Sequence, residues 1–209
     1  MNNLIICFPA GGGGHLVGAM CSFLLYGNKF QVKDNGSVHD FQCVRYLDGV
    51  TLDYTAESVV QEYADISRLP DFDIALAHFR NLAQLQSLGK KIVYIDFNED
   101  DAEIISSRLV VKMSTLLNQK TYDLLKGTDW PEYNELSDGT LDDLKELRTD
   151  FIKNWFYSIP VRKNNIFKIS FSELESGTWV NELSKFLGVV DYDERFVSEI
   201  LDEYRRKQL

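Results

Sequence analysis

Short apolar runs alternate with longer segments of helical periodicity along the chain. Residues 4–8 and 91–97 are apolar almost without interruption, which is typical of strands buried on both faces of a parallel sheet. The apolar runs at residues 74–78 and 166–169 predict further strands. Elsewhere, helical spacing of apolar residues and helix-end signals predict helices over residues 15–26, 56–66, 82–88, 100–116, 140–157, 178–186 and 194–206.

Two segments do not follow this alternation. Residues 30–47 mix β-forming side chains with turn-forming ones, and we expect irregular structure with a possible strand there. Residues 127–139 are dense in Gly, Pro, Asn and Asp, which predicts a long loop of the kind that often forms a lid or a binding loop. The alternation as a whole predicts an α/β domain with a mainly parallel sheet covered on both faces.

The composition is that of an ordinary globular protein. With 209 residues, 44% of them hydrophobic, the chain is long enough to bury a sizeable core, and we expect a single domain over residues 1–209. A formal net charge of -10 argues against nucleic acids and anionic membranes as partners, because their surfaces are bound by clustered cations. No basic leader or membrane-length apolar run is present, so we expect a cytoplasmic protein. Cys7, Cys21 and Cys43 lack metal-ligand spacing and are expected to be reduced.

Four consecutive glycines, Gly11, Gly12, Gly13 and Gly14, lie between the first predicted strand and the first predicted helix. In an open parallel sheet, ligands bind at the carboxyl ends of strands, where a loop passes into a helix. A loop without side chains lets its backbone N–H groups surround an anion, and the helix N-terminus adds partial positive charge. We therefore expect this loop to bind a phosphate or sulfate group; the alternative is that the glycines form only a flexible connection.

The end of the loop differs from that of common nucleotide-hydrolysing proteins. Their loops end in Gly-Lys-Ser/Thr, whereas this chain continues from Gly14 with His15 and Leu16. No lysine precedes Lys29. An ordinary kinase or ATPase is therefore disfavoured, because the lysine neutralises the β- and γ-phosphates and the hydroxyl holds magnesium.

The order of segments resembles the sulfotransferase family, in which a phosphate-loop fold uses the donor 3'-phosphoadenosine 5'-phosphosulfate without a metal. The resemblance implies a three-layer phosphate-loop NTPase-like α/β domain with a mainly parallel sheet flanked by helices. It rests on residues 8–16, similar to the loop around the phosphosulfate, residues 74–78, like the strand that ends in the catalytic histidine, residues 91–101, like the strand and turn around the 3'-phosphate, and residues 169–174 with 186–188 near the C-terminus.

The resemblance implies roles for particular residues. His78 corresponds to the base that accepts a proton from the acceptor hydroxyl; the alternative is a hydrogen-bonded histidine at a strand end. The donor's phosphosulfate would be held by the segment Ala10, Gly11, Gly12, Gly13, Gly14 and His15. The ring of His15 either reaches the anion or packs on the preceding strand.

The chain departs from the family at three positions. Ala10 replaces the loop lysine, Phe97 the arginine of the 3'-phosphate site and Ile105 its partner serine. Ser106 or Ser107 takes the serine's place after a small register shift, and Arg80 or Arg108 is a candidate for the missing positive charge.

The sequence thus predicts a sulfotransferase-like protein that moves a sulfuryl group from the nucleotide donor to a hydroxyl acceptor, with no metal. Two alternatives stay open. A divergent kinase or NTPase would use Asp96, at the end of an apolar strand, to position magnesium. A protein that kept the fold would bind an anion or nucleotide without catalysis. Trp130 and Tyr133 in the predicted long loop either stack on adenine or pack inward.

Overall fold

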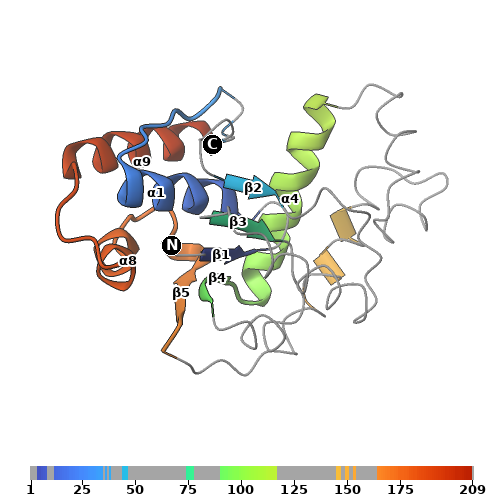
Figure 1. Ribbon diagram of the computed structural model, residues 1–209. Helices are drawn as coiled ribbons and strands as arrows, with labels where there is room; N and C mark the ends of the chain where they lie inside the picture. Colours follow the sequence, from blue (N-terminus) through green and yellow to red (C-terminus); the bar gives the residue numbers. More distant parts are fainter. Residues whose placement is uncertain are drawn as a thin grey trace.

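Five parallel strands form one sheet in the part of the chain that the computed structural model describes, which is residues 4–8, 12–34, 36, 38, 44–46, 74–77, 90–116, 145–146, 149–150, 153 and 164–208. The spatial order is β2-β3-β1-β4-β5, so β1 is the central strand (Figure 1). The strands are β1 (Leu4–Cys7), β2 (Val44–Tyr46), β3 (Ile74–Ala77), β4 (Lys91–Asp96) and β5 (Ile166–Ser170).

The central strands are buried on both faces. Leu4 is in register with Ile74 of β3 and Lys91 of β4, and all the residues of β1 are buried. Leu4 and Ile6 join the main hydrophobic core, whereas Ile5 lies on the opposite face and is equally inaccessible. The expectation of a buried parallel sheet is therefore confirmed.

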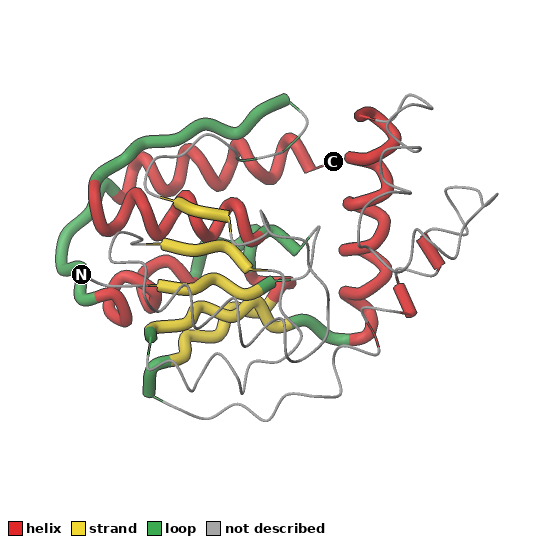
Figure 2. The backbone as a smooth tube through the Cα atoms, turned by 45° about the vertical axis from the view of Figure 1, so that its right-hand side comes forward, coloured by secondary structure: helices red, strands yellow, loops and turns green. Residues whose placement is uncertain are grey.

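Helices flank this sheet, as Figure 2 shows. The longest apolar helix, α1, packs against β1, β2 and β3, while α8 packs against α1 and β5. In both views α9 lies alongside α1, and α4 begins after β4 and runs beyond the carboxyl ends of the strands (Figures 1 and 2). The helices are α1 (Gly14–Tyr26), α4 (Glu99–Leu116), the 3-10 turn η2 (Phe171–Glu173), α8 (Trp179–Leu187) and α9 (Glu194–Gln208).

Most predicted elements agree with the observed ones to within one or two residues. The possible strand within residues 30–47 exists as β2. Residues 145–146, 149–150 and 153 are helical, in agreement with the helix expected over 140–157. The helices expected over 56–66 and 82–88 and the loop expected over 127–139 lie outside the described residues.

Local side-chain chemistry sets the helix ends. Asn98 and Asp101 cap α4 reciprocally, each side chain accepting a hydrogen bond of 2.9 Å from the other's backbone N–H. At the C-terminal ends of α1 and α8, Gly27 and Gly188 adopt the left-handed conformation, with φ of 72° and 82°. The predicted end of the first helix at residue 26 is confirmed.

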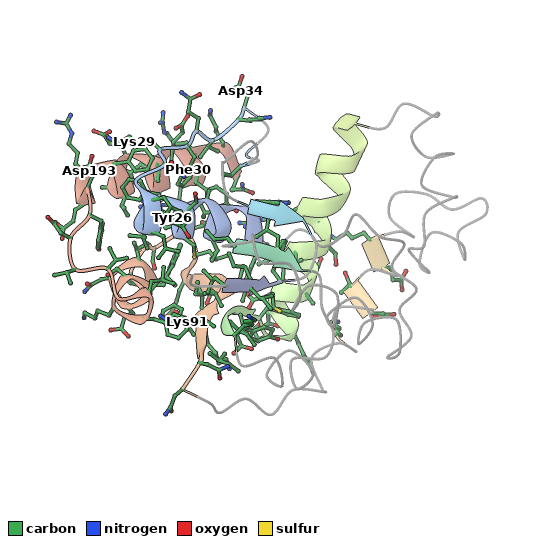
Figure 3. All side chains as sticks on the ribbon, viewed as in Figure 1. Tyr26, Lys29, Phe30, Asp34, Lys91 and Asp193 are labelled. Atoms are coloured by element: carbon green, nitrogen blue, oxygen red, sulfur yellow. The ribbon has the colours of Figure 1, made fainter. Side chains whose placement is uncertain are left out.

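The segment after α1 is tied to α9 by charged side chains. Lys29 donates to Asp193 over 2.9 Å and lies 5.1 Å from the ring centre of Phe196 (Figure 3). At the far end of α9, Lys207 donates to the carbonyl of Val32 over 2.6 Å. These contacts hold the C-terminal helix against the segment after α1.

Two of the three cysteines lie in the described residues. Cys7 and Cys21 are free and buried, and burial raises the pKa of each thiol far above its usual value. Both thiols are therefore protonated and unreactive. Among the described helices, none combines the length and the apolar character that a membrane span requires.

Candidate functional site

The glycine-rich segment lies at the carboxyl end of the central strand. The chain leaves β1 for β2 and β3 on one side, and β4 and β5 follow on the other side, so the strand order reverses at β1. Such a switch point is where open α/β sheets bind ligands. Gly12, Gly13 and Gly14 are described there, whereas Ala10 and Gly11 lie outside the described residues.

Gly13 marks the start of α1. Its φ is 78°, a left-handed conformation that disfavours other residues, and its carbonyl accepts hydrogen bonds from Leu16 and Val17 over 3.0 and 3.3 Å. A Cβ on Gly13 would lie 2.7 Å from Cδ1 of Leu174 and 3.5 Å from the hydroxyl oxygen of Tyr204. The backbone of this loop is thus approached closely by two segments from the C-terminal part of the chain.

Gly14 is required by packing against the preceding strand. A Cβ there would lie 2.1 Å from the ring of Phe8. The ring of His15 also meets Phe8, edge to face, with centres 5.6 Å apart. The helix start at Gly13 and the packing of Phe8 on Gly14 therefore explain why these two positions are glycine. Evidence for a ligand has to come from other residues.

Arg108 of α4 is a candidate cation of the site, and the structure describes its contacts. Its Nη2 donates to Oε1 of Glu175, and its guanidinium lies 5.1 Å from the ring centre of Phe171. The arginine side chain is only 19% exposed. A guanidinium with so little water around it is held in place by its carboxylate partner and by the aromatic face.

Tyr204 of α9 lies at the glycine loop. The residue is 3% exposed, and its hydroxyl oxygen lies beside Gly13. Burial raises its pKa to about 12, with Arg108 lowering and Glu175 raising the value by their charges. The phenol is therefore protonated at neutral pH and is available as a hydrogen-bond donor.

The two positions that the resemblance assigns to a 3'-phosphate site lie in the core. Phe97 and Ile105 are buried in the main hydrophobic cluster. Ser107 donates to the carbonyl of Glu103 over 2.8 Å, whereas Ser106 is fully buried and its Oγ has no hydrogen-bond partner among the described residues. Of the two serines, only Ser106 has a hydroxyl without a hydrogen-bond partner among the described residues.

Asp96, the residue of the magnesium alternative, is engaged by a neighbouring strand. Its carboxylate lies 2.7 Å from Nζ of Lys168 on β5. It also lies near Tyr94, whose pKa is raised by burial first and by Asp96 and Cys7 next. Asp96 thus forms an ion pair in which both side chains are partly exposed.

Several sequence-predicted residues lie outside the described part of the chain: His78, Arg80, Trp130 and Tyr133. Two residues of the site, Glu175 and Tyr204, were not singled out from the sequence. Tyr204 lies at the helical spacing of the apolar residues of α9, and that spacing predicts an ordinary core residue. Glu175 directly follows the segment 169–174, which carries part of the family resemblance. That position is the one feature of the sequence that could have pointed to Glu175.

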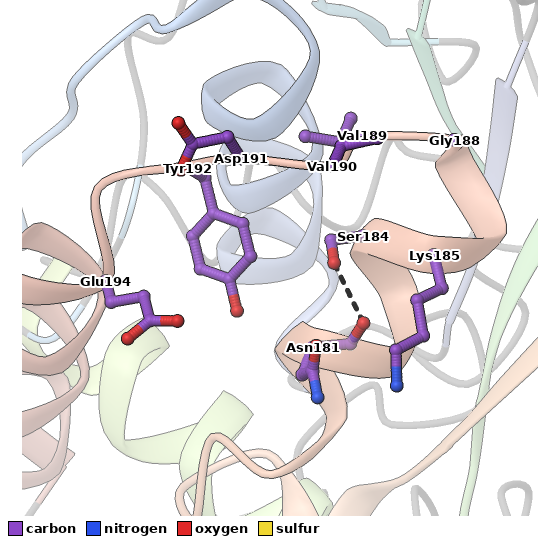
Figure 4. Close-up of a pocket in the computed structure, with 9 residues that line it drawn as sticks. All are labelled: Asn181, Ser184, Lys185, Gly188, Val189, Val190, Asp191, Tyr192 and Glu194. Atoms are coloured by element: carbon purple, nitrogen blue, oxygen red, sulfur yellow. Dashed lines mark hydrogen bonds between the residues drawn. The ribbon is translucent and has the colours of Figure 1, made fainter.

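A separate cavity of about 440 Å³ lies between α8 and the start of α9 (Figure 4). Tyr192 and Lys185 contribute to its wall, and Ser184 donates to the carbonyl of Asn181 over 2.8 Å. No three side chains of the kind that ligate metals gather anywhere in the described ranges. This cavity therefore offers mixed polar and apolar walls without a grouping that indicates catalysis.

Compared with models of known protein families and with curated protein sequences, the chain matches none. The resemblance to sulfotransferases accordingly rests on the four sequence segments.

Proposed function

We propose that this chain is a sulfotransferase-like protein of the three-layer phosphate-loop NTPase-like fold, which binds 3'-phosphoadenosine 5'-phosphosulfate at the glycine loop. One observation carries the proposal: the Tyr204 hydroxyl lies beside Gly13, at the carboxyl end of the central strand, and Arg108 binds Glu175, the residue after Leu174, which also packs at Gly13. A cation, a neutral donor and a helix N-terminus at a switch point are the groups that recognise an oxyanion. The strand order, with β1 between β3 and β4, supports the proposed fold.

The described residues fit one end of this donor better than the other. The phosphosulfate end matches the loop backbone together with Arg108, which takes over the charge that Ala10 lacks. The 3'-phosphate end does not match Phe97 and Ile105, because both are apolar and buried. Ser106 is the polar group left near those positions. We therefore assign the donor's phosphosulfate to the loop. We assign no described residue to its 3'-phosphate, because the Ser106 hydroxyl is buried.

The donor supplies an activated sulfuryl group. In the proposed reaction the acceptor oxygen forms a bond to sulfur, the bond between sulfur and the donor's 5'-phosphate oxygen breaks, and adenosine 3',5'-bisphosphate leaves. His78 accepts the proton of the acceptor hydroxyl, which suits an imidazole titrating near neutral pH. Arg108 offsets the negative charge at the phosphosulfate end.

A second function is favoured by a specific observation. Phe97 and Ile105 fill the positions of the 3'-phosphate site with core side chains, so a protein that binds an anion or nucleotide without transfer is the natural competitor. The magnesium-dependent alternative is disfavoured, because the loop lacks the Lys-Ser/Thr ending that holds the phosphates and magnesium.

Calorimetric titration with adenosine 3',5'-bisphosphate tests the proposal, with ATP plus magnesium as the comparator. The variant Gly12→Asp places a repelling carboxylate in the loop, and Gly12→Asn is its neutral control of the same size. We expect the bisphosphate to bind the parent chain and the Asn variant, and to bind the Asp variant much more weakly. Equal binding to both variants, or binding of ATP plus magnesium alone, would contradict the proposal.

Turnover separates the two favoured functions. A chain that binds the bisphosphate and transfers sulfate from the donor to a panel of phenols and alcohols is an enzyme of this class. Binding that is lost in Gly12→Asp but accompanied by no transfer identifies the non-catalytic alternative.

A further inference from the structure

The cavity between α8 and the start of α9 has a fixed wall and a fully exposed apolar side chain at its edge. Val189 and Tyr192 of this wall are partly buried and pack against the main hydrophobic core. Val190, which lies between them in the sequence, also lines the cavity and is 99% exposed. The other exposed large apolar side chains in the described ranges, Tyr26 and Ile104, are only 42% and 48% exposed. The chain therefore presents an unusually accessible apolar group directly beside a hollow.

Charges of opposite sign lie on the two sides of this cavity. In Figure 4 the carboxylate of Glu194 lies on one side of the Tyr192 ring, and the ammonium group of Lys185 lies on the other side. Both charged residues are exposed, and neither forms an ion pair with another described residue. Both charges are therefore available to a partner.

A second copy of the same chain matches such a surface. A ligand with charge of a single sign is attracted by one side of the cavity and repelled by the other. In a two-fold dimer each surface meets its own copy, so a cation on one side of the axis faces an anion from the other side. The surface that combines Lys185, Val190 and Glu194 is therefore complementary to itself.

We propose that the cavity between α8 and α9 is the contact surface of a homodimer. Val190 of each chain enters the cavity of the partner subunit, and Lys185 of each chain pairs with Glu194 of the partner subunit. This interface is independent of the glycine loop and of the proposed function, so either one is able to fail without the other.

The dimer is expected to be weak. Each chain has a formal net charge of -10, so two copies repel each other at long range. Exposed ion pairs alone contribute little, and the apolar contact of Val190 has to act together with them against this repulsion. Loss of either kind of contact therefore returns the chain to the monomer.

Sedimentation velocity of the full chain over a range of concentrations tests the proposal, and a concentration-dependent dimer is the expected result. Val190→Asp is expected to abolish the dimer, since it places a carboxylate in an apolar contact. Lys185→Glu and Glu194→Lys should each be monomeric, because each places like charges opposite one another. Arg206→Glu, near the other end of α9, is the control: it changes the net charge as Lys185→Glu does and should dimerise like the parent chain.

A mixture of the two charge variants gives the sharpest outcome. When a Lys185→Glu chain meets a Glu194→Lys chain, opposite charges face each other at both ion-pair positions. The mixture should therefore recover the dimer that neither variant forms alone, and general damage to the fold does not produce such a recovery. A parent chain that stays monomeric at every concentration overturns the proposal. A dimer that persists in Val190→Asp, or a mixture of the charge variants that stays monomeric, overturns it as well.

Discussion

The ring of Phe8 occupies the space that a side chain on Gly14 would need. A Cβ on Gly14 would lie 2.1 Å from two of the ring carbons, closer than atoms in contact can approach. Phe8 directly follows β1 and Gly14 is the first residue of α1. The contact therefore fixes how the first helix leaves the central strand.

Gly14→Ala is expected to destabilise the chain by about 1–3 kcal/mol, the usual cost of forcing atoms into a packed interior. Urea unfolding followed by fluorescence or circular dichroism measures this change. The double variant Phe8→Leu with Gly14→Ala is the control, because a smaller side chain at position 8 leaves room for the methyl group. If the cost of Gly14→Ala is the same in both backgrounds, the Phe8 contact is not its cause.

Much of the fold was predictable because its signals are local. The uninterrupted apolar runs of β1 and β4 and the helical spacing of α8 and α9 depend on neighbouring residues, and the observed bounds follow the predicted ones closely. β2 was harder, since its short apolar stretch lies among turn-forming residues, and its pairing with β3 is a long-range property.

The site was predictable only in part, for a related reason. The glycines between strand and helix predict a loop at a switch point, and the sequence also indicated Arg108 as a candidate cation. No local pattern, however, shows that Tyr204 reaches Gly13 or that Glu175 binds Arg108, because these contacts join residues far apart in the sequence. Tyr204 has the spacing of a core residue, and its hydroxyl becomes informative only once its surroundings are known.

Gly188 offers a test of backbone strain without steric conflict. It ends α8 with φ of 82°, and nothing lies within 4 Å of a Cβ placed there. Gly188→Ala should therefore cost about 1 kcal/mol from the left-handed conformation alone. Gly188→Asn should cost less, since Asn tolerates this conformation. Thermal or chemical unfolding of the pair measures the difference; equal costs would point to a source other than φ.

Ser106→Ala is expected to stabilise the chain by about 1 kcal/mol, because the buried hydroxyl has no partner among the described residues and alanine favours the helix. Ser107→Ala is the control, since that hydroxyl is bonded within its own helix, and its effect should stay within about 0.5 kcal/mol. Unfolding in urea distinguishes them. A destabilised Ser106→Ala variant would show that the hydroxyl has a partner, and weaker binding of adenosine 3',5'-bisphosphate would assign that hydroxyl to the nucleotide.

The carboxylate of Asp193 links pH to the attachment of the C-terminal helix. It accepts a hydrogen bond of 3.0 Å from the backbone N–H of Phe196 and pairs with Lys29, and these two interactions lower its pKa below the ordinary 3.8. A lowered pKa in the folded chain means that the ionised group stabilises the fold above the unfolded pKa. That stability is lost as the pH falls through the folded value.

Asp193→Ala should therefore lower the melting temperature at neutral pH, and its difference from the parent chain should shrink towards about pH 3 and below. Asp193→Asn keeps an oxygen that can cap the helix but has no charge for Lys29, so its melting temperature at neutral pH should lie between the other two. Because Asn does not titrate, the gap between the Asn and Ala variants should be independent of pH over this range. A parent–Ala difference that stays constant from neutral to acidic pH would show that the ionised carboxylate is not what holds α9 to the segment after α1.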